Sequence, residues 1–274
     1  EVQTYAVKNL KKGIAFLEQQ FGVKWDWDAF WKNAEMYNES SRCMIEKWDV
    51  NCTEHPQVCG AALALQREYE FMAAACMDKF MLKTDRRVTK MMLKGYEQDK
   101  AANAPQPKYR CLVWACPAHY YTNFTYWTQH CWGVTCVNDM EAMLSYQPIT
   151  IGDKEQALAD LVRCYEKMMM RSHTNGGYVN LLDECWKMCE KFHTNIVIMY
   201  DHVSCKNVGG LHGLFEDQAR ERGIHLIWIP HDVMDPRTVS RREMREAFSQ
   251  YMVTVLNEKP LDPTLLDYED TLSW

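Results

Sequence analysis

The first third of the chain has the spacing of amphipathic helices. Apolar residues recur at three- and four-residue steps, as in Leu10, Ile14 and Leu17, which predicts a helix with one buried face. Further helices are expected over residues 27–37, 61–82 and 88–96. The segment 103–107 contains two prolines and reads as a linker. We therefore expect residues 1–103 to form an all-helical lobe.

After the linker the pattern changes, because short apolar runs alternate with helical stretches. Buried parallel strands are predicted over 111–116, 133–137, 196–200 and 224–229. Helices are predicted over 124–130, 178–192, 211–222 and 241–256. The last of these begins with the capping box formed by Ser240 and Glu243. Such alternation predicts an α/β fold over residues 108–274, with a Rossmann-like parallel sheet and helices on both of its faces.

Composition and charge narrow the class of protein. The chain has 274 residues, 47% hydrophobic and 25% charged, as in ordinary globular proteins. Its formal net charge is -6 and it has no basic run, so we expect no nucleic-acid partner. Its 12 cysteines in a long apolar chain do not resemble a small disulfide-rich secreted domain. We expect a reducing, cytoplasmic location.

The stretch 111–138 contains no Asp, Glu, Lys or Arg, which makes a transmembrane helix worth testing. Pro117, two histidines and several threonines interrupt it, and such polar groups would need partners in hydrocarbon. It also divides into two strand-like pieces. We expect no membrane span, and the N-terminal residues show no secretion signal.

The loop after the predicted strand 196–200 is the first candidate for chemistry, because ligands of open α/β sheets bind beyond the carboxyl ends of the strands. It contains Ser204, Cys205, Lys206 and Asn207, followed by two glycines. Lys206 and the helix amides would favour the thiolate form of a cysteine at this position, and the thiolate is the form that binds metals or attacks electrophiles. Alternatively, Ser204 or Asn207 caps the helix and Cys205 packs.

The loop after strand 224–229 offers a second set of polar groups. His231 and Asp232, taken with His202 and Cys205, have the ligand types that zinc accepts. No paired CxxC or HExxH spacing accompanies them. Cys116 ends a predicted strand before Pro117 and is not counted among the ligands. A zinc-dependent hydrolase is therefore retained only as an alternative.

Three segments resemble the C-terminal region of a known family. They are the segment from Ser204 to Asn207, the strand that follows Gly223, and the Asp235-Pro-Arg237 turn before Ser240. The family is that of 2-hydroxyacyl-CoA dehydratases and benzoyl-CoA reductases. Upstream, residues 21–26 are similar to its inter-lobe segment. The Thr122-Asn-Phe124 sequence with Trp127 resembles the benzoyl-CoA reductase branch of the family. This resemblance slightly favours an aromatic substrate.

The resemblance implies a subunit of an oxygen-sensitive, anaerobic enzyme that acts on acyl-CoA thioesters. Members are heterodimers of homologous subunits with [4Fe-4S] clusters. An ATP-dependent activator protein supplies a low-potential electron, which reduces the thioester substrate to a radical. The substrate radical then loses its hydroxyl group in the dehydratases or proceeds to ring reduction in the benzoyl-CoA reductases. In this resemblance Cys205 corresponds to the last cluster ligand, with Ser204, Lys206 and Asn207 around it.

The chain also departs from that pattern. The family's other cluster cysteines lie in an N-terminal α/β lobe that the sequence does not contain, and one cysteine cannot hold four irons. We expect a fragment of a longer subunit, a lobe supplied by a separate polypeptide, or a subunit that has lost its cluster. The second alternative is therefore a cluster-free scaffold that holds a partner subunit of such a complex.

Overall fold

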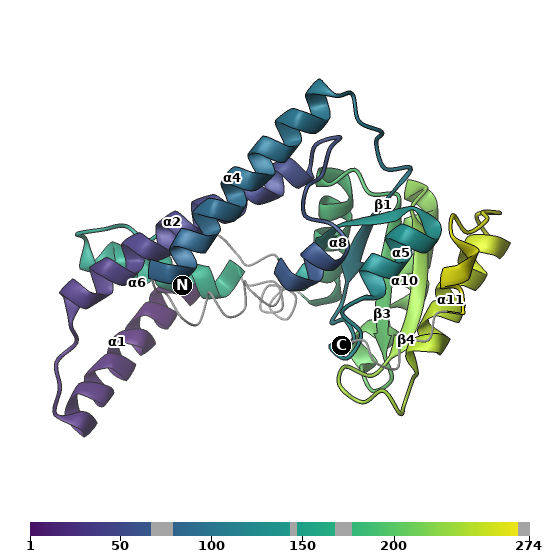
Figure 1. The fold of residues 1–274 in the computed structure, drawn as a ribbon. Coiled ribbons are helices and arrows are strands. Elements are labelled where there is room, and N and C mark those ends of the chain that lie inside the picture. The colour runs from purple at the N-terminus through teal and green to yellow at the C-terminus, as the bar shows by residue number, and fades with distance from the viewer. Residues whose placement is uncertain (67–78, 143–146, 168–176, 268–274) are drawn as a thin grey trace.

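A computed structural model describes residues 1–66, 79–142, 147–167 and 177–267. Long helices form one part of the molecule and a parallel sheet with its helices forms the other (Figure 1). The helical part contains α1 (Val2–Phe21), α2 (Trp27–Asn51) and α4 (Lys79–Ala101). The predicted helix 61–82 extends across residues 67–78, which lie outside the described residues.

Local sequence explains where these helices start and stop. The Asp26 side chain accepts a hydrogen bond from the backbone N–H of Ala29 at 2.9 Å and caps α2. Gly22 ends α1 with a φ of 65°, the left-handed conformation that glycine adopts without strain. The C-terminal half of α2 reaches the sheet, where the Asn51 amide donates to the carbonyl of Val137 at 2.8 Å.

A helix from the second half of the chain packs on the helical part. This is α6 (Lys154–Lys167), which the sequence pattern did not predict. It lies against α1 (Figure 1), and Lys11 pairs with Glu155 at 2.5 Å. Its Ala157 is buried in a small cluster with Ala34 of α2. The division of the chain at residues 103–108 stays a prediction.

The sheet has four parallel strands in the order β2-β1-β3-β4. They are β1 (Tyr109–Trp114), β2 (Val134–Asp139), β3 (Ile196–His202) and β4 (His225–His231). Every residue of β2 is buried, as expected for a parallel sheet covered on both faces. The α/β class with a parallel sheet is confirmed.

Helices cover both faces of this sheet, and ring contacts identify which helices share a face. On one face, Phe124 of α5 (Phe124–Trp132) contacts Phe248 of α11 (Arg241–Thr254), with centroids 5.9 Å apart. On the other, Trp186 of α8 (Gly177–Lys191) contacts Phe215 of α10 (His212–Arg222) at 5.8 Å. The predicted capping box of Ser240 and Glu243 is present at the start of α11.

The strand ends differ from the predicted ones by a few residues. The first strand stops at Trp114, whereas the pattern placed Cys116 inside it. Ala115 has a φ of 65°, which ends the extended conformation, and Pro117 has no backbone N–H to donate to a neighbouring strand. Cys116 therefore lies in the loop beyond the strand, where its side chain is half-buried.

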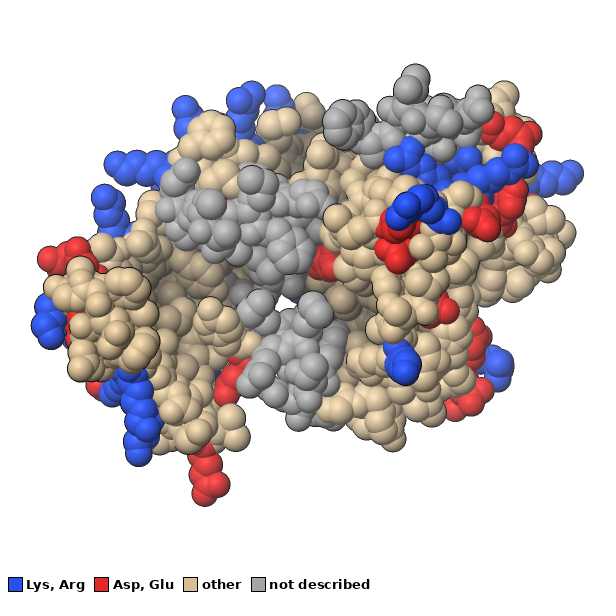
Figure 2. Space-filling model, turned by 90° about the horizontal axis from the view of Figure 1, so that it is seen from below, with Lys and Arg blue, Asp and Glu red and all other residues tan. Residues whose placement is uncertain are grey.

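Two surface properties bear on partners. In the described part of the chain, no helix combines the length and the apolar character that a membrane crossing needs. Lys and Arg side chains are distributed over the face in Figure 2, and Asp and Glu side chains lie among them.

Candidate functional site

A cavity of about 340 Å³ opens at the carboxyl ends of the strands. The strand order reverses between β1 and β3, because the chain passes from β1 to β2 on one side and returns to β3 on the other. Connections that leave neighbouring strands toward opposite faces open a crevice there, and ligands of α/β sheets bind at such points. The cavity lies at this position.

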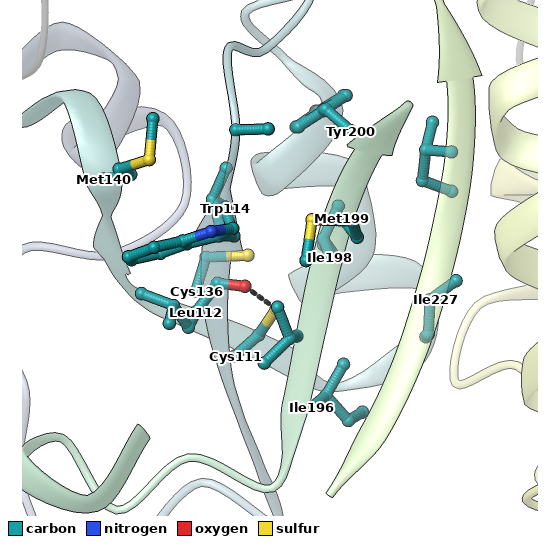
Figure 3. Close-up of a cluster of buried hydrophobic side chains, with 14 of the residues drawn as sticks. Cys111, Leu112, Trp114, Cys136, Met140, Ile196, Ile198, Met199, Tyr200 and Ile227 are labelled. Atoms are coloured by element: carbon teal, nitrogen blue, oxygen red, sulfur yellow. Dashed lines mark hydrogen bonds between the residues drawn. The ribbon is translucent and has the colours of Figure 1, made fainter. Parts of the chain in front are cut away.

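Apolar side chains form much of the cavity wall. Trp114 from the end of β1 is fully buried, and Met140 follows β2. Figure 3 shows the Trp114 ring on the same side as Met140, with Tyr200 near the upper end of β3. Leu181 and Val208 add to the apolar surface. A wall of this kind strengthens interactions with any charged group that enters, because it excludes water.

Cys205 lies in the wall of this cavity, on the turn that leaves β3. Its backbone N–H donates to the carbonyl of His202 at 2.9 Å, which fixes the turn. Cys205 is also the N-cap residue of α9 (Lys206–Gly209), a single helical turn. The charge at the end of so short a helix is small, so the expected contribution of helix amides to a thiolate is weak.

The neighbouring predicted residues have different positions. Asn207 lines the cavity with Cys205. Ser204 and Lys206 are exposed, and the cavity wall that the described residues form does not include them. The Ser204 hydroxyl lies 3.0 Å from Nδ1 of His202, and the Ser204 backbone N–H donates to the same nitrogen at 3.1 Å.

His202 also lines the cavity, and its ring orientation is fixed from both sides. Because Nδ1 accepts the backbone N–H of Ser204, the neutral ring carries its proton on Nε2. That nitrogen lies 3.8 Å from the carboxylate of Asp232. Two backbone N–H groups donate to Asp232 at 2.9 Å and lower the pKa of its carboxyl group.

His231 is fully buried. Burial disfavours the charged ring and lowers its pKa to about 4, and the nearby His202 adds to that shift. The zinc alternative grouped these two histidines with Cys205 and Asp232. The described part of the chain instead brings together a different group of metal-ligating side chains.

That group consists of Cys116, His119 and Glu141. Their ligand atoms all lie within 4.8 Å of one another, and each side chain is half-buried. The Sγ atom of Cys116 is 3.9 Å from Nε2 of His119. Cys116 and Glu141 line the same cavity as Cys205. Sequence reasoning missed this group, although the C-x-x-H spacing directly after a strand was a signal for it.

Two buried cysteines, Cys111 and Cys185, are unsuited to ligand roles. Cys111 and Cys185 have no exposed surface, and burial raises the pKa of each thiol well above its ordinary value. These thiols therefore stay protonated and pack as small apolar groups. A metal binds the thiolate form, so they are poor ligands.

Comparison with known proteins identifies the family. A family model described as 2-hydroxyglutaryl-CoA dehydratase, D-component, matches residues 1–252. The chain belongs to this family, which is the suspected one, and the match supports a subunit of a 2-hydroxyacyl-CoA dehydratase type. No curated protein matches the chain.

Proposed function

We propose that this member of the 2-hydroxyglutaryl-CoA dehydratase D-component family is a subunit of an iron-sulfur enzyme that dehydrates a 2-hydroxyacyl-CoA thioester. It works with a homologous second subunit and receives a low-potential electron from an ATP-dependent activator protein. The observation that carries the proposal is the position of Cys205, in the wall of a largely apolar cavity at the switch point of the sheet.

Cys205 is the proposed cluster ligand of this chain. Its thiolate would point a soft donor into a cavity whose walls are Trp114, Met140 and Leu181. A [4Fe-4S] cluster, when bound, supplies one-electron chemistry at a potential that hydrogen bonds and solvent exposure set. Asn207 is the neutral hydrogen-bonding side chain next to Cys205 in the wall. Ser204 and Lys206 act from outside, Ser204 by orienting His202.

The thiol content of the cavity constrains the ligand set. A [4Fe-4S] cluster is held by four ligands, normally cysteines. The cavity wall formed by the described residues contains two cysteines, Cys116 and Cys205. These residues therefore do not fit a complete cluster site by themselves. We propose that Cys205 is one ligand of the cluster and that the remaining ligands come from outside this cavity wall.

The family match favours dehydration over ring reduction. The aromatic residues that suggested an aromatic substrate have a structural role in this fold. Phe124 is fully buried and packs on Tyr200 and Phe248. Trp127 stacks on Phe124 and donates through Nε1 to the carbonyl of Leu265 at 2.9 Å. They belong to the core between α5 and α11, and an aliphatic 2-hydroxyacyl-CoA is the proposed substrate class.

Turnover by the assembled enzyme tests the proposal. The chain would be produced anaerobically with its second subunit, then assayed with the activator, ATP and a series of 2-hydroxyacyl-CoA thioesters. The expected product is the 2-enoyl-CoA, formed only when activator and ATP are present. Cys205→Ser should abolish turnover, while Cys43→Ser, at a half-buried cysteine of α2, should retain it. Turnover without the activator would contradict the proposal, as would full activity of Cys205→Ser.

A further inference from the structure

Three ligand atoms lie close together beside the cavity, two of them on residues of its wall, and their spacing differs from that of a cluster site. Ligands of a cluster bind separate irons, so their donor atoms stand well apart. Cys116, His119 and Glu141 have donor atoms within 4.8 Å of one another. Donor atoms so close together suit a single ion, and the inference stands on these residues independently of the proposed function.

The distances support one tetrahedral ion. With a metal–sulfur bond of about 2.3 Å and a metal–nitrogen bond of about 2.0–2.1 Å, the two donors of a tetrahedral zinc site lie about 3.5 Å apart. The observed separation between Sγ of Cys116 and Nε2 of His119 is 3.9 Å. A movement of about 0.4 Å, within reach of one side-chain torsion, brings the two donors to bonding distance.

The backbone holds all three side chains in place before any ion binds. The left-handed Ala115 turns Cys116 out of the strand direction. The N–H of His119 donates to the carbonyl of Val233 at 2.9 Å, which attaches this loop to the loop after β4. The N–H of Glu141 donates to the side chain of Asp139 at 2.8 Å. A site on rigid supports loses little entropy when it binds.

Charge and donor type define the ion. A cysteine thiolate and a glutamate carboxylate carry two negative charges together, and a divalent cation neutralises both in this half-buried place. Sulfur, nitrogen and oxygen donors in one set suit zinc or ferrous iron better than magnesium or calcium, which prefer oxygen alone. Three protein ligands leave a fourth position open, and Cys116 and Glu141 both border the cavity.

We propose that Cys116, His119 and Glu141 bind one divalent transition-metal ion, zinc or ferrous iron, with an open coordination position that faces the cavity. Three protein ligands and one exchangeable position are typical of catalytic metal sites rather than structural ones. An oxygen of a molecule in the cavity could take that position and be polarised there. The site differs from the proposed cluster in its ligands, and it requires no sulfide.

Cobalt titration of the full chain tests this site. The experiment uses the Cys205→Ala variant after treatment with a chelator, so that the proposed cluster ligand is absent. Co²⁺ is the probe, because a thiolate-to-cobalt charge-transfer band reports the sulfur ligand and the d–d bands report tetrahedral geometry. We expect one Co²⁺ per chain, with both features, and displacement of the cobalt by Zn²⁺.

Each proposed ligand has its own expected effect in that background. Cys116→Ser should remove the charge-transfer band, and His119→Gln and Glu141→Gln should each weaken binding by at least about tenfold. Matched controls are Cys43→Ser and His130→Gln, which lie in α2 and on the exposed side of α5. Both controls should bind Co²⁺ as the parent does. Far-UV circular dichroism checks that each variant is folded.

Three results would overturn the inference: cobalt binding without a thiolate band, unchanged binding in Cys116→Ser and His119→Gln, or failure of the Cys205→Ala chain to bind cobalt while the wild type binds it. The last result would place Cys205 in the same site. None of them depends on iron or sulfide in the heterodimer, so failure here and failure of the proposed function are separate outcomes.

Discussion

A buried ion pair joins the two longest helices of the helical part and allows a quantitative prediction. Nζ of Lys47 on α2 lies 3.2 Å from Oδ1 of Asp85 on α4, and their side chains are 2% and 1% exposed. The hydroxyl of Ser40 donates to the other carboxylate oxygen at 2.5 Å. Asp85→Ala would take this counter-charge away from a buried ammonium group.

The expected cost is large because the charge cannot reach water without opening the helix pair. Removal of one partner of a buried ion pair costs about 3–5 kcal/mol, a large share of the roughly 5–15 kcal/mol that stabilises a typical domain. The double variant Lys47→Met/Asp85→Leu removes both charges and fills their space. It should therefore recover most of the lost stability, since apolar replacements of buried pairs are often neutral or stabilising.

A neighbouring pair on the same helices supplies the control. Arg86, the residue after Asp85, pairs with Glu39 of α2, but these side chains are 57% and 30% exposed. Arg86→Ala should cost at most about 1 kcal/mol, because water already solvates both charges. Urea unfolding followed by circular dichroism gives the free energy of each variant, with equal m-values as the condition for comparison. The reasoning fails if Asp85→Ala and Arg86→Ala are equally stable, or if the double variant is no better than Asp85→Ala.

Three further predictions concern single residues. The pKa of His231 falls from 6.5 to about 4 on folding, so the unfolded state binds more protons between those pH values. The wild type should therefore lose about 3 kcal/mol of stability from this residue as the pH falls from 6.5 to 4. In urea titrations at the two pH values, His231→Leu should show a loss that is smaller by about 3 kcal/mol. Ser240→Ala should lower stability by about 1 kcal/mol through loss of the capping box, and a thermal melt with no shift would contradict that role. Ala115→Gly should raise stability by about 1 kcal/mol, since glycine adopts the left-handed φ of 65° without a Cβ clash, and a lower melting temperature would show that Ala115 is not strained.

The sequence predicted the sheet because each strand contains a short apolar run and the runs alternate with helical segments. Residues 196–200 form the core of β3, and all five are buried. The helix α6 was missed, although Ala157, Leu158 and Val162 recur at helical spacing and are its buried apolar side chains. Its position depends on contact with α1, more than 100 residues earlier in the chain, which no local pattern encodes.

The candidate site was likewise predictable only in part from the sequence. Cys205 could be found from one loop, because the rule about strand ends needs only the position of a strand. The group of Cys116, His119 and Glu141 depends on the pairing of β1 with β2, so that two strand ends bring distant residues together. The left-handed Ala115 adds to this, since a strand continued to Cys116 would point that side chain elsewhere.

Iron and acid-labile sulfide in the anaerobically purified heterodimer test the central claim most directly, with wild-type chain beside Cys205→Ala and Cys43→Ala. The account predicts about four irons and four sulfides for the centre that Cys205 ligates, their loss in Cys205→Ala, and their retention in Cys43→Ala. A stoichiometric heterodimer whose iron and sulfide do not change in Cys205→Ala would contradict the account. A heterodimer in which this centre is absent from the wild type would contradict it equally, and would identify the chain as a cluster-free scaffold.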